Sequence, residues 1–177
     1  MKHLRLLTSL LYWHIELYHL DLLYHPKKRN LVPLQDSIFL LLPGDKIKMD
    51  SQNLALLERL FAAFNWHDAD KVMACFSPEI IFDAIAGPEA VGRRIIGLQA
   101  TRDAFVNVWT TMPDVQWNVR RHAVFGNNRG LTEWLFTATT AQGGRIEAEG
   151  IDLFSFKDGL IIHKNAFRKD RPIQPAT

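Results

Sequence analysis

The sequence predicts a small α+β domain, and three observations carry this prediction. Apolar residues recur at helical spacing in segments between about residues 51 and 111. Four runs typical of β-strands follow between residues 115 and 168. Residues that favour tight turns separate those four runs. A chain that places its helices first and an antiparallel meander last typically folds into an α+β domain.

Two long segments and one short segment are predicted to be helical. The first helix begins at Ser51, because serine is a favoured helix N-cap. A short helix at residues 69–76 follows Asp68, a second predicted N-cap, and Pro78 stops it. A third helix spans residues 98–111. The apolar face of the first helix consists of Leu54, Leu57, Leu60, Phe61 and Phe64.

The strand predictions begin at residues 80–82, and the first strand ends near Gly87-Pro88. Residues 92–97 are predicted to form a loop. Turn chemistry then divides the remaining sequence, as in the triplet Lys157-Asp158-Gly159. The four runs of the predicted meander are residues 115–125, 130–141, 145–157 and 160–168.

Residues 1–49 differ in composition from the rest and contain four of the seven histidines. A leucine-rich and tyrosine-rich stretch at residues 4–24 carries polar groups that argue against a membrane-spanning helix. A short strand is predicted at residues 38–42, ended by Pro43-Gly44. Two interpretations stay open for this part: an extension from an upstream start codon, or a genuine accessory segment. The predicted domain organisation is an extension at 1–49, one domain at 50–172 and a tail at 173–177.

Charge and cysteine content exclude several classes of function. The net charge is +2 and no long run of Lys or Arg occurs, so nucleic-acid binding gains no support. Cys75 is the only cysteine, which excludes an intrachain disulfide and a cysteine-based zinc site. We interpret Cys75 as a small buried apolar residue. We expect no metal and no cofactor, no membrane partner, and a cytoplasmic location.

Two segments resemble a known family. Residues 57–65 (LERLFAAFN), Asp68 and residues 72–76 (VMACF) are similar to the opening of SnoaL-like proteins, in the nuclear transport factor 2-like superfamily. Residues 150–159 (GIDLFSFKDG) resemble a second signature found in SnoaL-like and ketosteroid-isomerase-like proteins. The resemblance covers about 120 residues. It implies a cone-shaped α+β barrel in which a curved antiparallel sheet wraps around a long N-terminal helix, leaving a pocket for a small apolar ligand.

Strand parity within this implied fold selects the pocket residues, because alternate residues of a strand share a face. A three-residue loop at residues 157–159 would pair Phe156 with Leu160 and place Asp152 opposite Lys164. His163 would then face the outer side of the sheet. Parity places Phe154, Lys164, Ala166 and Arg168 on the face of Asp152, the candidate catalytic residue. The resemblance implies the other members of the predicted substrate-binding wall: Leu60, Ala84, Trp134 and Phe136.

The resemblance also excludes two reactions of the superfamily. Steroid isomerases use a tyrosine and a carboxylate base, but the matching positions here are Leu60 and Ala84. Epoxide hydrolases use an Asp-Arg-Asp set, but the matching positions are Trp134, Phe136 and Ala166, none of which can move a proton. The sequence therefore argues against both reactions.

The remaining resemblance is to polyketide cyclases, in which one aspartate acts as acid and base, and Asp152 matches it. Three hypotheses stay open. The chain is a cofactor-free isomerase, cyclase or dehydratase acting on an apolar carbonyl compound through Asp152; or it binds such a ligand without catalysis; or it is a homodimeric interaction module. We expect a homodimer formed through the outer face of the sheet. A purely structural ion pair between Asp152 and Lys164 is the competing interpretation of the polar pair.

Overall fold

The structure is a computed structural model that describes residues 43–126 and 128–175. The predictions for residues 1–42, including the strand at 38–42, lie outside the described residues. No helix in the described part is long and apolar enough to cross a membrane. In chain order the elements are α2 (Pro43–Asn65), α3 (Ala69–Met73), β1 (Phe76–Glu89), β2 (Gly92–Ile96), α4 (Leu98–Thr111), β3 (Gln116–Phe125), β4 (Arg129–Thr139), β5 (Arg145–Lys157) and β6 (Leu160–Arg168).

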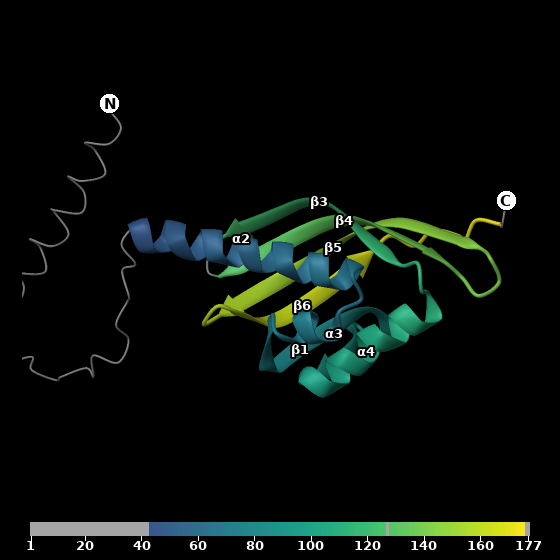
Figure 1. Cartoon of the computed structure of the whole chain (residues 1–177), viewed down its shortest axis with the longest axis horizontal. Helices are drawn as coiled ribbons and strands as arrows, with labels where there is room; N and C mark the ends of the chain where they lie inside the picture. Colours follow the sequence, from purple (N-terminus) through teal and green to yellow (C-terminus); the bar gives the residue numbers. More distant parts are fainter. Residues whose placement is uncertain (1–42, 127, 176–177) are drawn as a thin grey trace, which may run out of the picture. The chain divides into compact units, whose positions relative to one another are not determined.

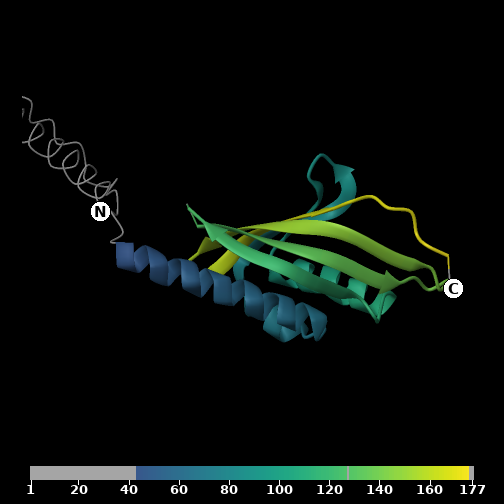
Figure 2. The ribbon, with the colours of Figure 1, turned by 90° about the horizontal axis from the view of Figure 1, so that it is seen from above.

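The six strands form one curved sheet in the order β2-β1-β6-β5-β4-β3 (Figure 1). β1 runs parallel to β6, and all other neighbouring strands are antiparallel. The sheet does not close, so β2 and β3 are its edges. Helices α2 and α4 lie on the same side of the sheet (Figure 2), where α2 packs against β3 and α4 against β1. The predicted α+β class is confirmed, with an open curved sheet and a long N-terminal helix.

Aromatic side chains between the helices and the sheet form much of the core. Phe105 of α4 is central, with its ring centroid 4.8 Å from that of Phe64 and 4.9 Å from that of Phe82. Phe61 of α2 contacts Phe64 edge to face at 5.6 Å. Such pairs add specific geometry to the burial of large apolar surfaces. The concave side of the sheet is therefore filled by α2 in one part and lined by α4 in another.

The first helix starts earlier than the sequence predicted. It begins at Pro43, so Ser51 is an interior residue whose Oγ donates to the Lys48 carbonyl 2.7 Å away. The prediction took Pro43-Gly44 as a strand end, but proline is also favoured in the first turn of a helix, where its missing N–H costs nothing. The predicted N-cap at Asp68 is confirmed, since its side chain accepts from the backbone N–H of Lys71.

The segment from residue 74 to 97 was also predicted incorrectly. The short helix ends at Met73, and β1 begins at Phe76 and includes Pro78. Proline is tolerated there because β1 has an irregularity between Phe76 and Ile81, where it need not donate a ladder hydrogen bond. The predicted loop at 92–97 is largely the edge strand β2, paired with β1. By contrast, the bounds of α4, β5 and β6 are those predicted.

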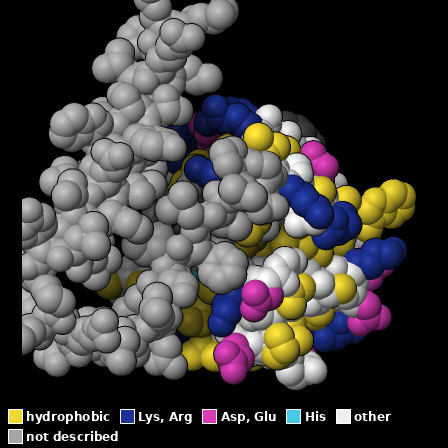
Figure 3. Space-filling view, turned by 90° about the vertical axis from the view of Figure 1, so that its left-hand side faces the viewer, with side chains coloured by type: hydrophobic (Ala, Val, Ile, Leu, Met, Phe, Trp, Pro, Cys, Tyr) yellow, Lys and Arg dark blue, Asp and Glu magenta, His cyan; other side chains and the backbone are white. Residues whose placement is uncertain are grey.

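Charged residues of both signs are mixed on the end of the molecule that Figure 3 shows. Lys and Arg side chains alternate with Asp and Glu on the visible part of this view, and apolar side chains lie among them. The part of the surface visible in this view therefore carries no large patch of a single charge sign.

Candidate active site

A cavity of about 260 Å³ lies on the concave side of the sheet, between α4 and strands from both halves of the sheet. Most of its wall is apolar or aromatic, which suits a small organic ligand. The wall consists of Phe82, Ala84, Ile85, Ala86, Arg93, Ile95, Ala104, Phe105, Asn107, Val108, Met112, Trp117, Trp134, Phe136, Asp152, Lys164, Ala166 and Arg168. Among these described residues, Asp152 is the one carboxylate.

Asp152 is fully buried on β5, and both of its carboxylate oxygens are hydrogen-bonded. Lys164 Nζ of β6 donates to Oδ1 at 2.7 Å, and Trp134 Nε1 of β4 donates to Oδ2 at 3.1 Å. The two donors come from the strands on either side of β5. Each carboxylate oxygen can accept a second hydrogen bond, so a ligand in the cavity could still reach Asp152.

Lys164 is as deeply buried as its partner, with 3% of its surface exposed. Its ammonium lies 4.9 Å from the centroid of the Phe82 ring and 6.0 Å from that of Phe154. Aromatic faces attract a cation, and this attraction offsets part of the cost of removing the ammonium from water. Lys164 is therefore held in a buried, aromatic site with Asp152 as its ionic partner.

Burial shifts the pKa of both members of this pair toward their neutral forms. It raises the pKa of Asp152, although the Lys164 charge and the hydrogen bonds from Lys164 and Trp134 oppose the shift. It lowers the pKa of Lys164, against the opposing charge of Asp152. Desolvation thus outweighs pairing for each group, which the sequence alone could not decide. A carboxyl group with a raised pKa is suited to accept and return a proton.

The predicted register between β5 and β6 was wrong, by one residue at the turn and by two residues at Asp152. Lys157 pairs with Leu160, and an irregularity at Ser155/Phe156 then brings Phe154 opposite Lys164 and Asp152 opposite Ala166. The two-residue turn alone would have placed Lys164 on the outer face, but the irregularity restores the parity. Asp152 and Lys164 therefore contact each other diagonally rather than directly across.

Seven of the nine predicted site residues line this cavity: Ala84, Trp134, Phe136, Asp152, Lys164, Ala166 and Arg168. The other two, Leu60 and Phe154, do not line it and are buried in the core, with 0% and 1% of their surface exposed. The reason is that α2 fills this part of the concave face, where Phe61 packs edge to face on Phe154 at 6.4 Å. The assignment of Leu60 and Phe154 to the ligand wall is corrected accordingly.

The sequence matches the model of a known protein family. A model described as the SnoaL-like domain matches residues 57–164, more than half of the chain. The chain belongs to the SnoaL-like domain family. No curated protein sequence matches it.

Solved structures share the SnoaL-like fold at low sequence identity. Bal32a, from a soil-derived mobile gene cassette, is 20% identical with a TM-score of 0.63, covering 69% of this chain and 92% of Bal32a. A proposed polyketide cyclase from Xanthomonas campestris pv. campestris is 18% identical with a TM-score of 0.60, covering 68% and 93% of the two chains. An LEH-like epoxide hydrolase from M. tuberculosis is 18% identical with a TM-score of 0.57, covering 68% of this chain and 84% of the hydrolase. These likenesses establish the fold alone.

Sequence reasoning missed the side of the SnoaL-like cavity that α4 and the β1–β2 pair supply. Phe105 and Val108 lie in the segment predicted as the third helix, which was not placed beside the pocket. Ile95 and Arg93 were missed because residues 92–97 were predicted as a loop. The three-residue spacing of Phe105 and Val108 was the available signal, and the long-range packing of α4 on β1 was not predictable from it.

The outer face of the SnoaL-like sheet carries a second buried carboxylate, Asp83 of β1. Arg94 donates to both of its oxygens at 2.8 Å, and His163 Nε2 lies 2.8 Å from Oδ2. These hydrogen bonds, chiefly those from Arg94, lower the pKa of Asp83 to about 2. His163 lies on the outer side as predicted, and its pairing with Asp83 depends on the parallel contact between β1 and β6.

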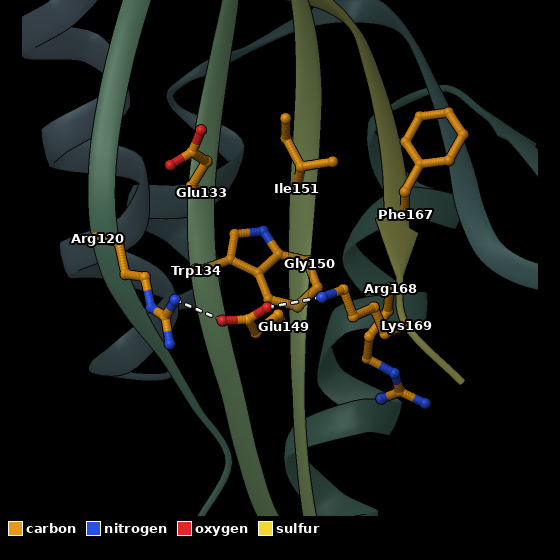
Figure 4. Close-up of a pocket in the computed structure, with 9 residues that line it drawn as sticks. All are labelled: Arg120, Glu133, Trp134, Glu149, Gly150, Ile151, Phe167, Arg168 and Lys169. Carbon is orange, nitrogen blue, oxygen red and sulfur yellow. Dashed lines mark hydrogen bonds and ion pairs between the residues drawn. The ribbon is translucent and has the colours of Figure 1, made fainter. Parts of the chain in front are cut away.

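The outer face also has a hollow of about 410 Å³, shown in Figure 4. Glu149 of β5 accepts from Arg120 and Lys169 along one side, and Ile151 and Phe167 form an apolar side. The hollow shares Trp134 and Arg168 with the inner cavity, but its carboxylates, Glu133 and Glu149, are partly exposed and paired with Arg and Lys side chains. The carboxylate of the inner cavity, Asp152, is buried. We therefore regard the inner cavity as the candidate active site.

Proposed function

We propose that this SnoaL-like protein binds a small, mainly apolar carbonyl compound in the inner cavity and moves a proton on it through Asp152. The reaction class is a cofactor-free isomerisation, cyclisation or dehydration. The observation that carries the proposal is a buried carboxyl group with a raised pKa on the wall of a largely apolar and aromatic cavity. General bases tuned in this way are common in sites that remove a proton beside a carbonyl group.

The proposed step needs no oxidant or reductant. Asp152 removes a proton from the carbon beside the carbonyl, and the electron pair of the broken C–H bond moves to the carbonyl oxygen as an enolate. Lys164 and Arg168 are the cations on the same wall that can hold this negative charge. The neutral Asp152 then returns its proton to another atom of the ligand, which restores the carboxylate. Trp134 acts as a positioning residue by holding Oδ2 throughout.

Deuterium exchange tests the proposal without knowledge of the natural substrate. The methyl ketone acetonaphthone has exchangeable protons beside its carbonyl, and proton NMR in D₂O follows their replacement by deuterium. We expect the wild-type protein to accelerate the exchange, and Asp152→Asn to lower the accelerated rate about 100-fold or more.

Asp83→Asn is the matched control, because it removes a buried carboxylate on the opposite face of the same sheet. It should leave the exchange rate unchanged within about twofold, provided that circular dichroism shows both variants folded. Equal exchange in wild type and Asp152→Asn would rule out Asp152 as the base.

Binding without turnover is the second candidate function. The observation that favours it is that both oxygens of Asp152 are already hydrogen-bonded within the protein. In that case acetonaphthone binds with similar affinity to wild type and Asp152→Asn, and neither protein exchanges its protons above the buffer rate. Steroid isomerases have a tyrosine and a carboxylate base at the positions that match Leu60 and Ala84. The apolar residues found here instead also favour binding without turnover.

The homodimer through the outer sheet face stays a prediction. Its support is the exposure of large apolar side chains there, with Phe167 49% and Ile96 64% exposed, among Arg and Glu residues of both signs. Such a surface can be complementary to a second copy of itself. Sedimentation velocity measures the mass directly, and a monomer at all concentrations would reject the dimer. The cytoplasmic location and the absence of a cofactor also remain predictions.

A further inference from the structure

We propose that the ligand of the inner cavity carries an anionic group, a carboxylate or its equivalent, which the two arginines Arg93 and Arg168 bind. The inference rests on the proposed function, in that it names the class of compound that the same cavity takes. It follows from the charges on the cavity wall and from the partners that those charges have.

The wall of the cavity carries an excess of positive charge that does not depend on proton transfer. Its charged residues are Arg93, Asp152, Lys164 and Arg168. Asp152 and Lys164 together contribute no net charge, whether their shared proton sits on the amine or on the carboxyl group. Arginine stays protonated in proteins. The wall therefore has two net positive charges, contributed by Arg93 and Arg168, against an otherwise apolar lining.

Neither arginine has an ionic partner among the residues that the structure describes. The ion pairs of the described part include Arg94, Arg102, Arg120, Arg121 and Arg171, but not Arg93 or Arg168. Burial lowers the pKa of Arg168, and the charge of Asp170 opposes this shift without forming an ion pair with Arg168. Figure 4 shows the Arg168 side chain pointing away from Glu149, whose carboxylate is occupied by Arg120 and Lys169.

The way in which Arg168 is held leaves its hydrogen-bond donors available. Its guanidinium carbon lies 4.8 Å from the centroid of the Phe136 ring, on the cavity wall. A cation at this distance is attracted by the ring, and no hydrogen bond ties the N–H groups of Arg168 to another side chain of the described residues. Those N–H groups are therefore available to bind an oxyanion in a forked arrangement. Arg168 is half-buried, whereas Arg93 is exposed on the edge strand β2. Arg168 should therefore make the stronger contact, and Arg93 should contribute mainly long-range attraction.

A pair of probes of nearly equal shape tests the inference. Naphthoate and acetonaphthone share the naphthalene ring, and the carboxylate of the first replaces the acetyl group of the second. Isothermal titration calorimetry of the wild-type protein should give a Kd for naphthoate about tenfold or more below that for acetonaphthone, equal to about 1.4 kcal/mol. Naphthoate should also displace acetonaphthone, because both occupy the same cavity.

Substitutions of the two arginines then show which residue causes the preference for naphthoate over acetonaphthone. Arg168→Gln should weaken naphthoate about tenfold and acetonaphthone by less, because a neutral carbonyl oxygen gains less from the guanidinium than a carboxylate does. Arg93→Gln should weaken naphthoate about threefold, with acetonaphthone unchanged within about twofold. Arg171→Gln is the matched control, since Arg171 is paired with Glu147 and lies outside the cavity wall, and it should change neither affinity. The preference for naphthoate should fall as salt is added.

Three results would overturn the inference. Acetonaphthone could bind the wild type as tightly as naphthoate, which would leave the proposed function intact and remove only the anionic ligand. Naphthoate could bind without displacing acetonaphthone, which would assign the anion to another site such as the outer hollow. Finally, neither probe could bind, which would reject the ligand-binding cavity and the inference together.

Discussion

Gly150 of β5 lies where the indole of Trp134 crosses the inner face of the sheet. A Cβ atom at this position would overlap the ring carbons Cη2 and Cζ3 of Trp134 and the carbonyl oxygen of Phe167. Glycine is therefore required for close packing rather than for a positive φ. Since the same indole donates to Asp152, the absence of a side chain at residue 150 positions the candidate catalytic carboxylate.

Gly150→Ala should lower the free energy of unfolding by about 2–3 kcal/mol, because overpacking forces the indole or the backbone to shift. Urea denaturation measures this loss, and the deuterium exchange catalysed by the folded protein should fall as Trp134 moves. Gly126→Ala is the control, because a Cβ there meets no atom within 4 Å. A stability change at Gly150 no larger than that at Gly126 would contradict the packing argument.

At the scale of residues, the sequence predicted the polar pair but not its contacts. Asp152 and Lys164 share a face as predicted, but a two-residue turn and the irregularity at Ser155/Phe156 bring this about rather than the predicted three-residue loop. The hydrogen bond from Trp134 and the exclusion of Leu60 and Phe154 from the cavity depend on rotamers and on the packing of α2. Those features arise from three-dimensional packing and leave no separate pattern in the chain.

Three strands meet at the Asp83 cluster, which joins β1 to β2 through Arg94 and to β6 through His163. Asp83 itself is 1% exposed, whereas the side chain of Arg94 is 41% exposed. Because the hydrogen bonds from Arg94 and His163 hold the pKa of Asp83 at about 2, below the usual range of an aspartate, the folded protein favours the ionised carboxylate. The cluster thus stabilises the open edge of the sheet next to the cavity.

The pH dependence of stability follows from this lowered pKa. The contribution of Asp83 is present above about pH 4 and is lost as the pH falls toward about 2, because the unfolded chain binds the proton first. Asp83→Asn should therefore cost about 1–2 kcal/mol at about pH 6, after allowance for the exposure of Arg94, and much less at about pH 2. Urea denaturation at both pH values measures the difference.

The control for this experiment is Asp103→Asn, which changes an exposed carboxylate on α4 that accepts only from Gln99 among the described residues. It should alter stability by less than about 0.5 kcal/mol at either pH. A destabilisation by Asp83→Asn that is the same at both pH values would show that the ion pair is not its cause.

At the scale of elements, predictions succeeded where local chemistry is unambiguous. Pro113 ends α4, and Gly and Asp residues form the turns beside β5 and β6. These residues favour a turn over a continued helix or strand, so the sequence indicates the bounds locally. The start of α2 and the strand β2 were missed because Pro43-Gly44 and Gly92 suit more than one structure. Gly92 has a φ of +85° and lies inside a strand pair, so the residue that indicated a loop begins an edge strand.

The architecture of the whole domain explains why this SnoaL-like chain has a cavity although the positions that match the catalytic residues of steroid isomerases, Leu60 and Ala84, are apolar. The curved sheet and α4 form the wall mainly from apolar side chains, so the cavity does not depend on Leu60 or Ala84 being polar. Family resemblance predicted this architecture from two short segments. It could not predict the charge of the wall, because Arg93 reaches the cavity only through the pairing of β2 with β1.

The location of a bound ligand tests the central claim most directly. A crystal structure of the protein soaked with acetonaphthone should show the naphthalene ring between α4 and the sheet, packed against Phe105 and Phe136. Its carbonyl oxygen should lie within hydrogen-bond distance of Lys164 or Arg168, with the methyl group facing Asp152. Density for the ligand only in the outer hollow beside Phe167, or an inner cavity closed by side chains, would contradict the account.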